Sequence, residues 1–210
     1  MRILLFLVFA CAALAQPVSF GVKGGANLTA WFTTEGWRNS YADQSGRYTV
    51  GPMVEVRLPC CLRLEVDALY RHYGSAFAGG IAGVYFYSQS SKAATWEFPA
   101  LAKYSLRREG SLRPFIGVGP VYRWVGQQHV AYTCTGSLCG SAAGTQTSTL
   151  PGFASLGFVV GAGAEWKNLQ PRLSADIRYS RFERDQGDMD GGSQIRTNQN
   201  QLVLLFGVTF

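Results

Sequence analysis

The feature that most constrains this chain is a two-residue alternation of apolar and polar side chains, which repeats in eight segments. Successive side chains of a β-strand point to opposite faces, so this alternation predicts strands with one apolar face. The clearest case is 62–73, LRLEVDALYRHY, where apolar residues alternate with four charged ones. The other predicted strands are 17–32, 47–58, 95–106, 113–126, 154–167, 172–182 and 199–210.

The composition agrees with paired strands. Aromatic residues make up 13% of the chain and charged residues 15%, with 25 glycines, whereas ordinary soluble domains carry roughly 25% charged residues. The formal net charge is +6, but Arg107-Arg108 is the one adjacent basic pair in the sequence. Because nucleic-acid-binding proteins usually cluster their basic residues, we expect no nucleic-acid partner.

The N-terminal stretch MRILLFLVFACAALAQ has the pattern of a signal peptide. It combines one positive charge, an apolar run and the small residues Ala13 and Ala15, which signal peptidase accepts before its cleavage site. We therefore predict a signal peptide over 1–15 and one barrel domain over 16–210. The alternative is a lipoprotein acylated at Cys11. The apolar run is too short for a membrane helix of about 20 residues.

Export would place four cysteines in an oxidising compartment. Cys134 and Cys139 lie five positions apart in a stretch rich in serine, threonine and glycine, so they could close a small loop. Cys60 and Cys61 are adjacent, and a bond between neighbours strains disulfide geometry. Their pairing stays open.

The predicted strands are joined by connections that alternate in length. The long connections are 33–46, 74–94, 127–153 and 183–198, and the short ones are 59–61, 107–112 and 168–171. Even-stranded barrels of outer membranes have this asymmetry, with short periplasmic turns and long outer loops. We therefore predict an all-β fold, a transmembrane eight-stranded antiparallel up-and-down β-barrel. A soluble barrel of lipocalin type, with its apolar face inward, is the alternative fold.

Aromatic residues of the predicted strands fall at two levels, as expected for girdles at the two membrane interfaces. The predicted outer girdle contains Trp31, Tyr48, Tyr70, Trp96, Trp124 and Tyr179, and the inner girdle contains Phe20, Tyr104, Trp166 and Phe210.

The polar face of the predicted barrel carries charges of both signs. An eight-stranded barrel is just wide enough inside for side chains, and buried charges are tolerated when they are paired. We therefore expect a network that plugs the lumen, formed by Glu55, Arg57, Arg63, Glu65, Asp67, Arg71, Glu97, Lys103, Arg123, Glu165, Asp176 and Arg178. The inward-facing Gly161 and Gly163 would leave room for longer side chains opposite.

The mature chain resembles the family of small outer-membrane β-barrel proteins, similar to the OmpA transmembrane domain and OmpX. The segments GVKGGANLT, RPFIGVGPVYRW, GFVVGAGAEWK and the terminal QLVLLFGVTF carry this resemblance. The resemblance implies an outer-membrane location among lipid and lipopolysaccharide, and no cofactor. It also implies that Phe206, Val208 and Phe210 form a C-terminal signal read by the barrel-assembly machinery. No peptidoglycan-binding domain follows the predicted barrel, so we expect no cell-wall anchoring role.

His72 and Ser75 are the candidates for catalysis. The resemblance brings in lipid A deacylases, which carry His-x-Ser on one strand face. Here Gly74 occupies the second place after His72, and Ser75 would lie on the opposite face of a continuing strand. The other histidine of the sequence, His129, falls in a predicted outer loop with no visible partner. We expect a protein that is not an enzyme.

Two predicted outer loops carry other features. Glu183, Asp185, Asp188 and Asp190 lack the spacing of a calcium loop, so they are interpreted as a solvated loop tip, with loose bridging of divalent cations as the alternative. The stretch 133–149 is either a recognition loop or a tolerated insertion. The predicted function is structural or surface-interacting, with a narrow porin-like channel as the alternative and a lipid A-modifying enzyme after it. The loop ligand is unknown.

Overall fold

The computed structural model describes residues 18–30, 32–35, 40–107, 110–166, 171–183 and 194–210. The predicted signal peptide, Cys11, Trp31, Asp185, Asp188 and Asp190 lie outside these residues. Among the described residues, no helix reaches the length and apolarity of a membrane span.

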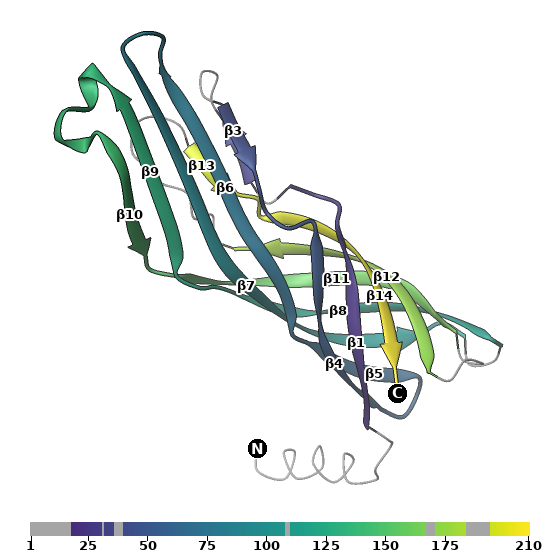
Figure 1. The fold of residues 1–210 in the computed structure, drawn as a ribbon. Helices are drawn as coiled ribbons and strands as arrows, with labels where there is room; N and C mark the ends of the chain where they lie inside the picture. Colours follow the sequence, from purple (N-terminus) through teal and green to yellow (C-terminus); the bar gives the residue numbers. More distant parts are fainter. Residues whose placement is uncertain (1–17, 31, 36–39, 108–109, 167–170, 184–193) are drawn as a thin grey trace.

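Eight antiparallel barrel strands form a closed barrel (Figure 1). In chain order they are β1 (Val18–Asn27), β4 (Tyr48–Arg57), β5 (Leu62–Asp67) with β6 (Leu69–Ile81), β7 (Tyr85–Ser105), β8 (Leu112–Val125), β11 (Phe153–Trp166), β12 (Arg172–Phe182) and β14 (Asn200–Thr209). β1 pairs with both β4 and β14, so the barrel has no free edge there. The N–H of Phe210 donates to the carbonyl of Phe20 at 2.8 Å and extends this closing pair.

The predicted strand 62–73 is one barrel strand in two pieces, β5 and β6, with a break at Ala68. Pro52 lies opposite on β4 and has no N–H to give to the ladder. The N–H of Ala68 still donates to the Pro52 carbonyl at 3.0 Å. The alternation therefore continues across the break, and odd-numbered residues from Arg63 to Ser75 stay buried.

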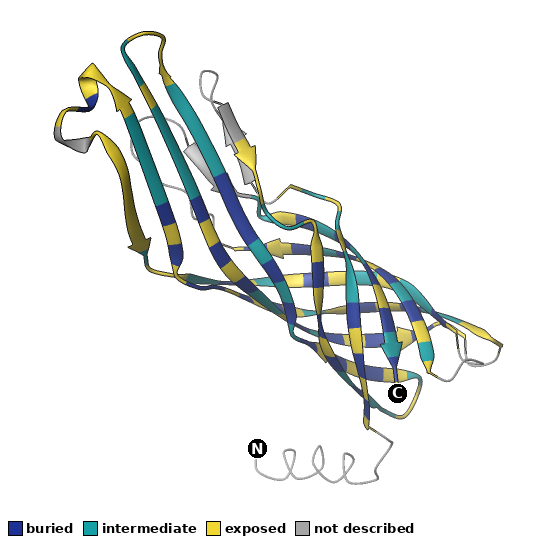
Figure 2. Cartoon of the chain, in the orientation of Figure 1, coloured by how far each residue is buried: buried dark blue, intermediate teal, exposed yellow. Residues whose placement is uncertain are grey.

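The apolar face of the barrel points outward and the charged face points inward. Figure 2 shows buried and exposed residues alternating along the barrel strands. Val22, Val66, Val118 and Val160 are 39–56% exposed, while charged neighbours such as Lys23 and Glu65 are fully buried. A lipocalin-type barrel has the opposite arrangement, so that alternative is excluded.

Two aromatic levels are present where the sequence predicts them. At the outer level the rings of Tyr70 and Trp96 are 5.3 Å apart, and Trp96 lies opposite Trp124 in the ladder. At the inner level four aromatic side chains are more than 40% exposed, namely Phe20, Tyr104, Trp166 and Phe210.

The sheet continues far beyond the barrel at its outer end, and this corrects the prediction of long loops there. The segment 74–94 is mostly strand, because β6 and β7 form one hairpin that turns at 82–84. The segment 127–153 contains β9 (Gln128–Gly136), the 3-10 helix η1 (Ser137–Ala142) and β10 (Gly144–Leu150). β9 pairs with β7 and with β10, and β3 (Ser40–Asp43) pairs with β6. We call β3, β9, β10 and the outer parts of β6 and β7 the outer sheet (Figure 1).

Two short strands form a separate pair near the barrel's outer end. β2 (Phe32–Glu35) and β13 (Gln194–Thr197) run antiparallel. They connect two predicted loops, 33–46 and 183–198.

Candidate functional site

The middle of the lumen is organised around Glu65. Its carboxylate lies 2.7 Å from the Lys23 ammonium and 2.7 Å from the Arg178 guanidinium, and it also pairs with Lys103. These side chains come from β5, β1, β12 and β7, and each is at most 3% exposed. A single carboxylate therefore links four barrel strands across the lumen.

Arg178 ties two further acids into the same cluster. Its guanidinium lies 2.5 Å from the Asp67 carboxylate and 2.5 Å from the Asp176 carboxylate. Asp176 also accepts from Lys23 at 3.2 Å. The cluster, which we call the central cluster, balances three carboxylates against three cations, as buried charges require. Its members are Lys23, Glu65, Asp67, Lys103, Asp176 and Arg178.

A second charged layer lies toward the inner end of the barrel. Arg63 contacts Glu55 at 3.3 Å and pairs with Glu165. It also donates to the Ser105 hydroxyl at 3.1 Å. Arg172 contacts the other oxygen of Glu55 at 3.4 Å. This layer joins β4, β5, β7, β11 and β12.

A third layer lies toward the outer end. Arg123 donates to Glu97 at 3.0 Å, and its guanidinium lies 3.3 Å from the centre of the Phe182 ring. Such stacking is a cation–π contact, which gains strength when it is desolvated. Arg71 donates to the Gln201 side chain at 3.2 Å and to the Gly46 carbonyl at 3.0 Å.

Apolar side chains fill the lumen between the central cluster and the outer layer. Two clusters of buried residues meet this description: Leu101, Val121, Val159 and Phe182, and Leu69, Val203 and Leu205. A cavity of about 10 Å³ lies among them, which is about the space of one water molecule. The lumen is therefore packed as a protein core in this region.

The twelve predicted lumen residues differ in how deeply they are buried. Arg57 and Glu97 are only half-buried, and the other ten are buried. Sequence reasoning missed Lys23 and Arg172 as network members, although both are out of phase with the apolar residues of their strands. It also missed the inward apolar layer, because Leu69, Leu101 and Val203 are flanked by equally apolar residues.

A family comparison places this barrel among known proteins. The model for the outer membrane protein beta-barrel domain matches residues 2–210. The chain belongs to this family. Its location is the outer membrane, as the alternation and the closed barrel indicate. No curated protein matches the chain.

Solved outer-membrane barrels resemble it at low sequence identity. Neisserial surface protein A is 17% identical, with 93% of this chain and 100% of that chain covered and a TM-score of 0.38. OprG from Pseudomonas aeruginosa is 12% identical, with coverage of 92% and 94% and a TM-score of 0.49. Ail of Yersinia pestis, solved in complex with the heparin analogue sucrose octasulfate, is 9% identical, with coverage of 93% and 100% and a TM-score of 0.41. We draw no functional conclusion from likeness at this level.

The catalytic candidates of this family member are not brought together. The β6 strand continues to Ile81, and His72 and Ser75 lie opposite Ala94 and Ser91 of β7. They are three positions apart on one strand, so their side chains point to opposite faces. Ser75 is 9% exposed on the inward face. His129 is exposed on β9, which is separated from β6 by β7. A nucleophile and its base need hydrogen-bond reach, and this arrangement does not provide it.

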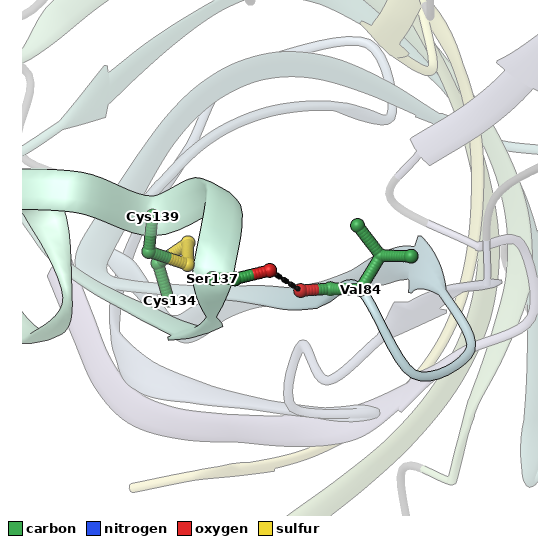
Figure 3. The surroundings of a disulfide bond; sticks show 4 residues. All are labelled: Val84, Cys134, Ser137 and Cys139. Atoms are coloured by element: carbon green, nitrogen blue, oxygen red, sulfur yellow. Dashed lines mark hydrogen bonds between the residues drawn. A yellow bond between two sulfur atoms is a disulfide. The ribbon is translucent and has the colours of Figure 1, made fainter.

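A disulfide closes the tip of the outer sheet (Figure 3). Cys134 at the end of β9 bonds Cys139 in η1, with their Cα atoms 5.9 Å apart. Between them the N–H of Ser137 donates to the Val84 carbonyl at 3.0 Å, and the Ser137 hydroxyl donates to the same oxygen at 3.4 Å. The disulfide therefore closes the turn between β9 and η1, and the Ser137 hydrogen bonds hold that turn against the β6–β7 hairpin. Cys60 is an exposed free thiol in an inner turn, and Cys61 lies beside it and is half-buried.

Glycines make room for the buried charges, and this gives a first prediction. A Cβ on Gly161 would lie 3.2 Å from the Arg178 side chain and 3.2 Å from the Ile177 carbonyl. We expect Gly161→Val to lower the free energy of unfolding by about 1–3 kcal/mol, because overpacking displaces Arg178. Ala162→Val is the matched control, since Ala162 is exposed on the lipid face. Urea unfolding in lipid vesicles measures both, and equal stability of the two variants would contradict the predicted crowding.

Proposed function

We propose that this protein is a non-conducting, non-enzymatic outer-membrane barrel that holds a rigid β-sheet above the membrane for surface interaction. The observation that carries the proposal is the central cluster, which spans the lumen between β1, β5, β7 and β12 with side chains at most 3% exposed. An ion would have to break several buried ion pairs to pass. The packed apolar layer beyond it supports the same conclusion.

The outer sheet is the part of the molecule suited to an interaction role. Long segments on a rigid scaffold often carry binding, and here the scaffold is continuous with the barrel strands β6 and β7. β10 is the last strand of the sheet and is exposed along nearly its whole length. Its sequence, GTQTSTL, has no charge and offers hydroxyl and amide groups. We infer a partner at the cell surface that is bound through polar contacts.

The proposal also covers the surroundings and the assembly of the barrel. Phe206 and Phe210 are 59% and 77% exposed on the outward face of β14 and its end. Exposed aromatic side chains there are accessible both to lipid and to the barrel-assembly machinery. Lipid and lipopolysaccharide are the proposed neighbours of the apolar face.

Electrical recording tests the non-conducting barrel directly. The folded protein, verified by the shift in gel mobility between unboiled and boiled samples, is inserted into planar lipid bilayers. We expect no steady single-channel currents in 1 M salt. The screening length is then about 3 Å, but buried ion pairs are screened much less than exposed ones. Steady currents would overturn the proposal and favour the narrow porin-like channel.

A further inference from the structure

The inner mouth of the barrel contains a basic cavity that the proposed function does not use. Its volume is about 290 Å³, and it lies at the end where β4, β5, β8 and β12 meet the inner turns (the end marked C in Figure 1). Five arginines line it: Arg57, Arg63, Arg107, Arg113 and Arg172. The described residues that line it include no carboxylate. We call this cavity the arginine vestibule.

Among the described residues, Glu55 and Glu165 pair with two of the vestibule's arginines, Arg63 and Arg172. Arg63 and Arg172 share Glu55, and Arg63 also pairs with Glu165. The cavity therefore gathers five guanidinium groups with no carboxylate in its described lining. Like charges gathered at one site repel each other, and an anion bound among them would relieve that repulsion.

Two of these arginines also hold donors that are not used within the described part of the chain. The buried Nε–H of Arg63 and the buried Nη2 group of Arg172 have no acceptor there. The Arg63 side chain is only 8% exposed and lines the vestibule. A buried donor without an acceptor is unfavourable, so an acceptor group in the vestibule would be stabilising.

We propose that the arginine vestibule binds a phosphate-bearing anion. Each guanidinium group presents parallel N–H donors that match two phosphate oxygens at once. A phosphate has more acceptor oxygens than a carboxylate, so it suits a site where several arginines meet. Leu58 and Leu62 form an apolar part of the same wall, and Leu62 is 40% exposed on the outward face of β5. The vestibule therefore suits a phosphate attached to an apolar neighbour, such as a phospholipid headgroup, as well as a free phosphate.

Binding is tested on the folded barrel in octyl glucoside, a detergent without phosphate, by isothermal titration calorimetry. The probes are inorganic phosphate, short-chain dihexanoyl phosphatidylglycerol and the dicarboxylate succinate. We expect saturable binding of both phosphate probes and at least tenfold weaker binding of succinate. Tighter binding of the lipid than of inorganic phosphate would assign the site to a headgroup, whereas equal affinities would assign it to free phosphate.

Variants locate the site. Arg57→Gln and Arg172→Gln are each expected to weaken phosphate binding about tenfold or more, since a hydrogen bond to a charged group contributes about 1.5–3 kcal/mol. Arg181→Gln is the matched control, because Arg181 is exposed at the outer end of β12. Heat-dependent gel mobility verifies that each variant is folded. The proposal is overturned if neither phosphate probe binds saturably, if succinate binds as tightly, or if Arg181→Gln weakens binding as much as Arg57→Gln.

Discussion

Replacing Glu65 with glutamine is expected to lower the free energy of unfolding by about 3–5 kcal/mol, because it leaves buried cations without a counter-charge. Glu65 is fully buried and pairs with Lys23, Lys103 and Arg178. The substitution keeps the shape of the side chain and removes only its charge. The central cluster would then hold two carboxylates against three cations. Urea titration in lipid vesicles, followed by tryptophan fluorescence, measures the change.

A second substitution tests whether charge balance is the cause. In Glu65→Gln/Lys103→Gln the cluster returns to two carboxylates and two cations, so we expect at least half of the lost stability to return. Glu183→Gln is the matched control, because Glu183 is exposed just beyond the end of β12, and it should change stability by less than about 0.5 kcal/mol. If Glu65→Gln behaves like Glu183→Gln, the central cluster does not stabilise the barrel.

The sequence predicted which face of each strand enters the lumen, but not which charges meet there. Which side chains point into the lumen depends only on the local two-residue period of each strand. Partner choice depends on stagger between strands that are distant in the chain. Lys23 reaches Asp176 across 153 positions and Glu65 across 42, and no local pattern records those distances. Five scattered arginines likewise meet at the inner mouth only because four strands and a turn end there.

The outer sheet was missed for a different reason. The segment GSAFAGGIAGVYFYSQSSKA is rich in glycine and serine, which are typical of turns. It forms strands because its aromatic residues pair between strands. The rings of Phe77 and Tyr87 are 6.0 Å apart, and those of Tyr87 and Tyr132 are 6.3 Å apart. Such pairs stabilise a sheet by about 0.2–1 kcal/mol each, and they appear only once the register is known.

Arginine substitutions at two heights on the outward face can locate the edge of the membrane, because an added charge lowers stability strongly only where that face contacts lipid. Val118 is 56% exposed on β8, six residues from Trp124 at the outer aromatic level and six from the start of the strand. It therefore lies near the middle of the membrane. We expect Val118→Arg to lower the free energy of unfolding in lipid vesicles by about 2–4 kcal/mol, the cost of arginine on the lipid face at the bilayer midplane.

Phe86→Arg is the matched comparison for the outer sheet. Phe86 is 51% exposed on the same outward face of the barrel wall, ten residues beyond Trp96 along β7. At about 3.3 Å per residue it lies roughly 30 Å along the strand from Trp96, which places it beyond the outer aromatic level and in water. The same substitution there should cost less than about 0.5 kcal/mol. Only a water–lipid border between the two positions gives the two substitutions different costs. Equal losses of stability would therefore mean either that lipid reaches the outer sheet or that Val118 does not face lipid.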